Sequence, residues 1–151
     1  MNTTTSESMR ISENNLNHKF REQLREVGLN SIDMLRGETF NLASILLSDE
    51  DIVAGVFGRS KDGGSVLFLI TNLRIISISQ IPLFTDTDEF ALSAVNGVSL
   101  DSSRFGSTIE IYTSIGNYSI HTHNKEAADR FVEFLEHTAI ENLESEKINK
   151  V

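Results

Sequence analysis

The fold is decided by an apolar stretch in the middle of the chain, Gly64-Ser65-Val66-Leu67-Phe68-Leu69-Ile70-Thr71-Asn72-Leu73-Arg74-Ile75-Ile76-Ser77-Ile78. Two runs of β-branched, aliphatic and aromatic residues are separated there by the polar pair Thr71-Asn72, and this pattern predicts two strands joined by a turn. The first run, Val66–Ile70, has no polar residue, which is typical of a strand covered on both of its faces. The stretch therefore predicts a hairpin whose first strand is buried on both sides.

Strand signals continue on either side of this hairpin. Ile52–Arg59 is rich in β-branched residues and alternates with a period of two, and the following Asp62-Gly63-Gly64 tolerates the positive φ of a tight hairpin. A third strand over Leu73–Ser79 is expected to end before Pro82, because proline has no amide hydrogen to donate to a neighbouring strand. Further strands are predicted over Glu89–Leu92, Gly97–Ser102, Ser107–Thr113 and Tyr118–His123. The expected total is about seven antiparallel strands.

An amphipathic helix is predicted after the last strand, with Asn124 capping its first turn. Its apolar face consists of Ala128, Phe131, Val132, Leu135 and Ala139. Strands connected by hairpins leave an open end, and an apolar helix face must cover something. We therefore expect this helix to close the open end of the strands.

The N-terminal part of the chain predicts a second helix, from about Ser12 to Val27, with Gly28 placed to stop it. Its apolar stripe consists of Leu16, Phe20, Leu24 and Val27. This stripe is too apolar to stay exposed, so it must pack on its own chain or on a neighbour's. The first eleven residues are rich in Thr, Ser and Asn and are expected to be loose, while two short helical pieces are expected around residues 32–35 and 40–47.

Length and charge restrict the class of protein. A chain of 151 residues is long enough for one domain with an appendage. Its net charge of −9 argues against binding to nucleic acid and against a general electrostatic hold on anionic lipid. The absence of cysteine excludes disulfides and thiolate zinc sites. No secretion signal and no window of roughly 18 apolar residues is present, so we expect a cytoplasmic protein.

The residues from about Ile45 to Leu143 resemble bacterial pleckstrin-homology-like (PH-like) domains, especially the YokE-like branch, and more distantly GRAM domains. The resemblance is carried by the central stretch quoted above, by Leu46-Leu47-Ser48-Asp49-Glu50-Asp51-Ile52 and by Phe90-Ala91-Leu92-Ser93-Ala94-Val95-Asn96-Gly97-Val98. It implies an α+β, mainly β fold, a bent barrel of about seven antiparallel strands closed by a C-terminal helix, here with an added N-terminal helical segment. The expected organisation is a flexible N-terminus over residues 1–11, a helical segment over 12–47, the PH-like domain over 48–143 and a tail over 144–151.

Three basic residues are candidates for binding a ligand. PH folds that hold phosphoinositides usually use cations in and beside the first hairpin loop, and Arg59 and Lys61 occupy that place here. The surrounding acidity favours reading both as solvated turn residues. Arg74 lies between apolar residues of the third strand, where pairing with a carboxylate is favoured over contact with a ligand.

The sequence gives little indication of a metal site or of a catalytic site. His121 and His123 are two apart on a strand and share a face, but no third ligand is near in sequence, so both are read as exposed strand residues. Asp86, Asp88 and Glu89 lack the ligand spacing of a calcium loop and are interpreted as a solvated loop. No nucleophile with its base, carboxylate pair or phosphate-binding loop emerges. We therefore expect no metal, no cofactor and no enzymatic activity.

The preferred functional hypothesis is a protein-interaction or scaffolding module. Such a fold can receive a protein partner, or a second copy of itself, at a sheet edge or in the groove beside the closing helix, and the stripe formed by Leu16, Phe20, Leu24 and Val27 could take part. The alternative is a peripheral membrane module that recognises an anionic lipid headgroup. A carrier of small ligands would need polar groups inside the barrel, whereas the inward positions read as Val, Ile, Leu and Phe.

Overall fold

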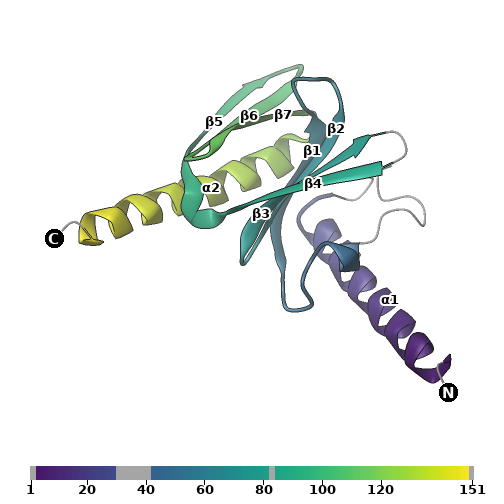
Figure 1. Ribbon diagram of the computed structural model, residues 1–151. Coiled ribbons are helices and arrows are strands. Elements are labelled where there is room, and N and C mark those ends of the chain that lie inside the picture. Colours follow the sequence, from purple (N-terminus) through teal and green to yellow (C-terminus); the bar gives the residue numbers. More distant parts are fainter. Residues whose placement is uncertain (1–2, 30–41, 82–83, 150–151) are drawn as a thin grey trace.

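The computed structural model describes residues 3–29, 42–81 and 84–149 (Figure 1). Its elements are α1 (Thr3–Glu26), the short 3-10 helix η2 (Leu42–Ser44), β1 (Ile52–Arg59), β2 (Ser65–Thr71), β3 (Arg74–Ile81), β4 (Phe84–Ala91), the 3-10 helix η3 (Leu92–Ala94), β5 (Val95–Ser103), β6 (Gly106–Thr113), β7 (Gly116–Thr122) and α2 (Lys125–Asn149). Pro82 and the helical piece expected around residues 32–35 lie outside the described residues. Within those residues no helix is long and apolar enough to cross a membrane.

The seven strands form one antiparallel sheet in the order β4-β3-β2-β1-β7-β6-β5. Figure 1 shows that this sheet bends sharply, so that α2 runs along its concave side between the β1–β4 half and the β5–β7 half. The fold predicted from the sequence, a bent seven-stranded sheet with a C-terminal helix and an added N-terminal helix, is confirmed.

The two halves of the sheet meet where β1 passes β7. These strands pair only at Arg59 and His121, and the Thr122 hydroxyl donates a hydrogen bond of 2.7 Å to the Phe57 carbonyl oxygen beside that pair. A Cβ atom on Gly58 would lie 2.0 Å from the His121 carbonyl oxygen. Only a glycine lets the two backbones come this close. Gly58 therefore permits the junction that turns two hairpin sheets into one bent sheet.

The central hairpin is buried on both faces, as its apolar sequence predicts. Every residue of β2 after Ser65 is buried. On the concave face the Phe68 ring meets the Phe131 ring of α2 edge to face, with centroids 6.5 Å apart. On the opposite face Leu29, which follows α1, packs closely on Gly55, where an added Cβ atom would lie 2.9 Å from the Leu29 side chain. The N-terminal segment thus covers the outer face of the sheet while α2 covers the inner face.

Helix α1 packs on its own chain, which is one of the two expected alternatives. Phe20 and Leu24 are fully buried, Val27 is buried, and Leu16 is half-buried against the core. The helix ends as predicted at Gly28, which has a φ of 92°, and the amide of Leu29 donates to the Leu24 carbonyl oxygen in a Schellman turn.

The predicted start of α1 is wrong, because the helix begins at Thr3 rather than near Ser12. The side chains from Ser6 to Asn15 are exposed, so no tertiary packing marks this part of the helix in the sequence. Each residue added to an existing helix gains a backbone hydrogen bond, and a polar segment can therefore continue a helix that is anchored further along.

Strand β4 is longer than predicted, and the acidic run interpreted as a loop lies within it. β4 begins at Phe84, whereas the sequence predicts its start at Glu89. Residues 86–89 are exposed, and they are held in the strand by pairing with β3 rather than by burial. An edge strand with solvated side chains gives no apolar alternation, which is why its first half could not be recognised.

Helix α2 follows its prediction closely. The Asn124 side chain caps it by accepting a hydrogen bond of 3.1 Å from the Ala127 amide. The predicted apolar face is buried, together with Ala127 and Thr138. Two long-range contacts tie the start of α2 to the end of α1: Asn124 donates to the Gly28 carbonyl oxygen and Arg130 to the Glu26 carbonyl oxygen.

We predict that Gly58→Ala lowers the free energy of unfolding by about 2 kcal/mol or more, because the added methyl group forces β1 and β7 apart at their only pairing point. The matched control is Gly64→Ala, whose Cβ would have no neighbour closer than 3.8 Å. Urea unfolding of both variants checks this. Equal stability of the two variants would contradict the role given to Gly58.

Candidate functional site

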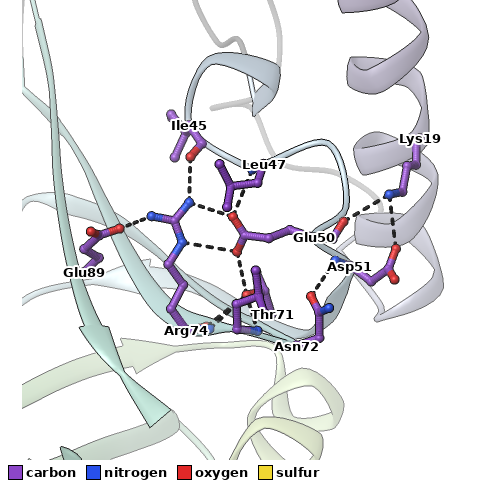
Figure 2. Close-up of polar contacts among 10 residues, drawn as sticks. Lys19, Ile45, Leu47, Glu50, Asp51, Thr71, Asn72, Arg74 and Glu89 are labelled. Carbon is purple, nitrogen blue, oxygen red and sulfur yellow. Dashed lines mark hydrogen bonds and ion pairs between the residues drawn. The ribbon is translucent and has the colours of Figure 1, made fainter.

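Arg74, one of the three basic candidates, is the centre of a polar network at the start of β3 (Figure 2). Its guanidinium donates to both carboxylate oxygens of Glu50, with Nη2–Oε1 at 2.6 Å and Nε–Oε2 at 3.2 Å. Nη2 also donates to the Ile45 carbonyl oxygen at 2.9 Å, and Nη1 contacts the Glu89 carboxylate on β4. The expected pairing of Arg74 with a carboxylate is confirmed. All three nitrogens of its guanidinium already have protein partners.

Glu50 is the buried partner in this network, with no exposed surface. Its carboxylate also accepts hydrogen bonds from the Leu47 amide at 2.9 Å and from the Thr71 hydroxyl at 2.7 Å. Burial raises the pKa of this carboxyl, but the hydrogen bonds from Arg74, Leu47 and Thr71 and the charge of Arg74 outweigh it, so the pKa lies below its ordinary value. Glu50 is therefore ionised and fully hydrogen-bonded inside the protein.

Helix α1 is fastened to the segment next to Glu50. The Lys19 ammonium donates to the Ser48 and Glu50 carbonyl oxygens and pairs with the Asp51 carboxylate at 3.2 Å. Gln23 accepts a hydrogen bond from the Ile52 amide and donates one to Asp51. The hydrogen bonds from Gln23 and Lys19, with the charge of Lys19, lower the pKa of Asp51. The N-terminal helix is thus tied to the chain just before the sheet begins.

Sequence reasoning missed Glu50. It lies in the acidic run Asp49-Glu50-Asp51, whose pattern resembles an exposed turn. Nothing local distinguishes it from its neighbours, because its burial depends on Arg74, which lies 24 residues further along the chain. The one available signal was Arg74 itself, a charged residue in an apolar strand that requires an opposite charge.

The structure does not bring the three basic candidates together. Arg59 is exposed at the end of β1, where it pairs with Ser65 and His121. Lys61, in the turn between β1 and β2, is 76% exposed and lies 3.8 Å from the Glu110 carboxylate. Arg74 is engaged with Glu50, away from both. Contact of any of these residues with a ligand stays a prediction.

A pocket of about 280 Å³ opens beside the β1–β2 turn, between β2 and β3 on one side and β6 and β7 on the other. The turn contributes Ser60, Lys61 and Asp62, and the strands contribute Val66, Phe68, Ser77, Ser79, Glu110, Asn117, Tyr118 and Ser119. Of the three basic candidates, only Lys61 lines it. The expectation that all inward positions are apolar is wrong here, because the buried Ser77 lies on the concave face opposite Phe68.

Tyr118 connects the two halves of the sheet at the floor of this pocket. Its ring stacks on Phe90 of β4 at 4.7 Å and meets Phe68 of β2 at 6.2 Å. Its hydroxyl donates to Asp88 at 3.4 Å, and burial, then the Asp88 charge and this hydrogen bond, raise its pKa. The Tyr118 ring is thus held against two aromatic rings of the β1–β4 half of the sheet.

The two histidines lie close together, without a third potential metal ligand beside them in the described part of the chain. The two imidazoles meet edge to face, 5.3 Å apart, but His123 follows the end of β7 instead of lying in it. Both ring nitrogens of His121 are within hydrogen-bond distance of protein oxygens, those of Thr108 and Phe105. Across residues 3–29, 42–81 and 84–149 no group of three potential metal ligands is present.

We predict that Arg74→Met lowers the free energy of unfolding by about 3–5 kcal/mol, because it leaves the Glu50 carboxylate buried without its counter-charge. Arg25→Met removes the exposed ion pair with Glu22 and serves as the control, with an expected loss of about 1 kcal/mol or less. Chemical denaturation measures both. Similar losses in the two variants would show that the buried pair has no special role.

We also predict a pH dependence for this network. Because the pKa of Glu50 is lower in the folded protein, the unfolded chain binds the proton more readily and stability falls as the pH falls. The contribution is complete above the ordinary pKa, near 4.5, and is lost as the pH drops through the lowered value of the folded state. Unfolding measurements on wild type and Glu50→Gln from about pH 7 to about pH 3 should show the stability difference shrinking. A stability difference between wild type and Glu50→Gln that does not change with pH would contradict the lowered pKa of Glu50.

The comparisons with known proteins agree with the fold. A family model described as bacterial PH domain matches residues 46–137. The chain is also similar to the crystal structure of a pleckstrin homology domain from Shewanella amazonensis SB2B, with a TM-score of 0.50 and 15% identity, over 66% of this chain and 92% of that one. At such low identity this likeness shows the fold alone. No curated protein matches the chain.

The YokE-like or GRAM-like subtype stays a prediction. The matched region runs from Leu46, in the segment that leads to Glu50, into α2, and so includes the whole bent sheet. Because the family model matches more than half of the sequence, the chain belongs to the bacterial PH domain family.

Proposed function

We infer that the protein is a non-catalytic interaction module that binds an extended protein segment along the edge of β5, beside the end of α2. The observation that carries this proposal is the apolar side of α2, which continues past the sheet next to an unpaired strand edge. A second copy of the chain could supply such a segment, so self-association falls within the same proposal.

The edge of β5 is available for pairing. β5 is the last strand of the sheet and has β6 as its single neighbour in the described chain. Asn96 and Ser99, in the first part of β5, are exposed. An unpaired edge offers backbone amide and carbonyl groups to a strand from another molecule. Strand addition of this kind gives affinity through backbone hydrogen bonds.

The end of α2 provides an apolar surface beside that edge. The buried positions Leu135 and Ala139 are followed, four residues later, by Leu143, which is 54% exposed. Ile140 nearby is 55% exposed. Asn142 fixes this part of the helix to the start of β5 by donating to the Leu92 and Val95 carbonyl oxygens. Figure 1 shows the C-terminal part of α2 extending beyond the sheet.

Charge indicates what the partner should contain. The end of α2 carries Glu141, Glu144 and Glu146 around its exposed apolar residues. An extended segment with an apolar side chain for Leu143 and basic residues beside it complements this surface. An anionic membrane surface does not complement these glutamates. At the β1–β2 turn, Lys61 already lies near the Glu110 carboxylate.

We predict that linear peptides selected against the full chain shift the amide NMR signals of β5 and of α2 beyond Ala139. Leu143→Ala should weaken such a peptide by about tenfold, the effect expected of an apolar residue at the centre of an interface. Glu136→Ala, at another exposed position of α2, is the control and should leave the affinity unchanged.

Light scattering of the same proteins tests whether a second copy of the chain supplies the segment. In that case the full chain should form a dimer that Leu143→Ala weakens and Glu136→Ala does not. The proposal fails if selected peptides map to other strands, or if no peptide is selected and the chain is a monomer.

A further inference from the structure

Among the described residues, one buried polar side chain has no hydrogen-bond partner. The buried polar side chains of the described residues are Glu50, Thr71, Ser77, Ser107, Thr113, Thr122 and Thr138. All except Ser77 make a side-chain hydrogen bond. Ser77 is 8% exposed, and its hydroxyl bonds to nothing in the described chain. Because an unsatisfied buried hydroxyl costs free energy, such a group normally has water or a ligand as its partner.

The Ser77 hydroxyl lines the pocket beside the β1–β2 turn, together with other groups that can bond a ligand. Ser79 lies two residues along β3 and therefore on the same concave face, and its side chain also makes no hydrogen bond with the described residues. Asn117 and Ser119 also line the pocket, but they alternate with Tyr118 along β7, so their side chains point to the other face of that strand. Hydroxyl groups act as both donors and acceptors. The pocket therefore offers two neutral hydroxyl groups of β3 on its concave side.

Aromatic rings and charges narrow the class of ligand. Phe68 and Tyr118 line the pocket with apolar surface, and the Tyr118 ring is held in place by stacking on Phe90. The one cation of the lining, Lys61, is paired with Glu110, and Asp62 adds a second carboxylate. A phosphate would therefore meet a surface with an excess of negative charge. The lining suits a neutral molecule with hydroxyl groups at its rim and an apolar face.

We propose that this pocket binds a small uncharged polyhydroxylated ring, a monosaccharide or a cyclic polyol. Its hydroxyl groups bond to Ser77 and Ser79, and its apolar face lies against Tyr118. The volume of about 280 Å³ is close to the lower end of ligand pockets, roughly 300 Å³, and admits one such ring. The site shares no residue with the β5 and α2 surface, so each can fail without the other.

The experiment titrates the full chain with glucose, galactose, N-acetylglucosamine and myo-inositol, and in parallel with glycerol and with myo-inositol hexakisphosphate. Amide NMR shifts and calorimetry report binding. We expect at least one neutral ring to shift signals of β2, β3 and β7, with Ser77→Val weakening it by about tenfold or more through the lost hydrogen bond. The control Ser99→Val, at an exposed position of β5, should not change the affinity.

Three outcomes overturn the proposal: no neutral ring binds, which leaves ordered water as the partner of Ser77; the phosphorylated ring binds more tightly than the neutral ones; or Ser77→Val binds as wild type does. A titration with an oligosaccharide that ends in the same ring distinguishes a free sugar from the end of a larger glycan, and binding of either one supports the site.

A second measurement needs no ligand. If the Ser77 hydroxyl has no protein partner, Ser77→Ala should not lower the melting temperature of the free protein. A pronounced drop would show that the hydroxyl is used in folding, which contradicts its assignment to a ligand.

Discussion

The buried ion pair between Glu50 and Arg74 is the constraint on which the arrangement of this domain depends. A carboxylate without exposed surface can remain charged only if its partners are held in place, and here they come from the segment before β1, from the end of β2 and from β3. A buried ion pair can often be replaced by apolar residues without loss of stability. The role of this pair is therefore to fix one arrangement of the segments that it joins. The Glu50–Arg74 pair connects two parts of the chain: the segment before β1, to which α1 is fastened, and the β2–β3 hairpin, which is the most buried hairpin of the sheet.

Most of the fold could be predicted because its signals are local. The apolar run of β2, the glycine-containing turn after β1 and the capped amphipathic α2 each depend on residues close together in sequence. Two features could not be recognised in this way. The first half of β4 is exposed and is a strand only because β3 pairs with it, and the exposed start of α1 has no packing to mark it.

The candidate sites were harder to predict than the fold. Arg74 could be recognised as needing a carboxylate, but its partner Glu50 could not be chosen among neighbouring acids. Ser77 belongs to a run that reads as apolar, and only the pairing of β3 with β2 shows that its hydroxyl points to the concave side. Both cases depend on contacts between distant segments, which periodicity in the sequence does not report.

Because α1 covers the outer face of the sheet and α2 covers the inner face, the two faces are covered at different times during synthesis of the chain. α1 leaves the ribosome first and can shield the outer face of β1 and β2 as soon as these strands form. The inner face has no such early cover, because α2 is made last and the contact of β1 with β7 spans more than half of the domain. Until then the nascent chain exposes one apolar face, which is the kind of surface that chaperones bind and that promotes aggregation.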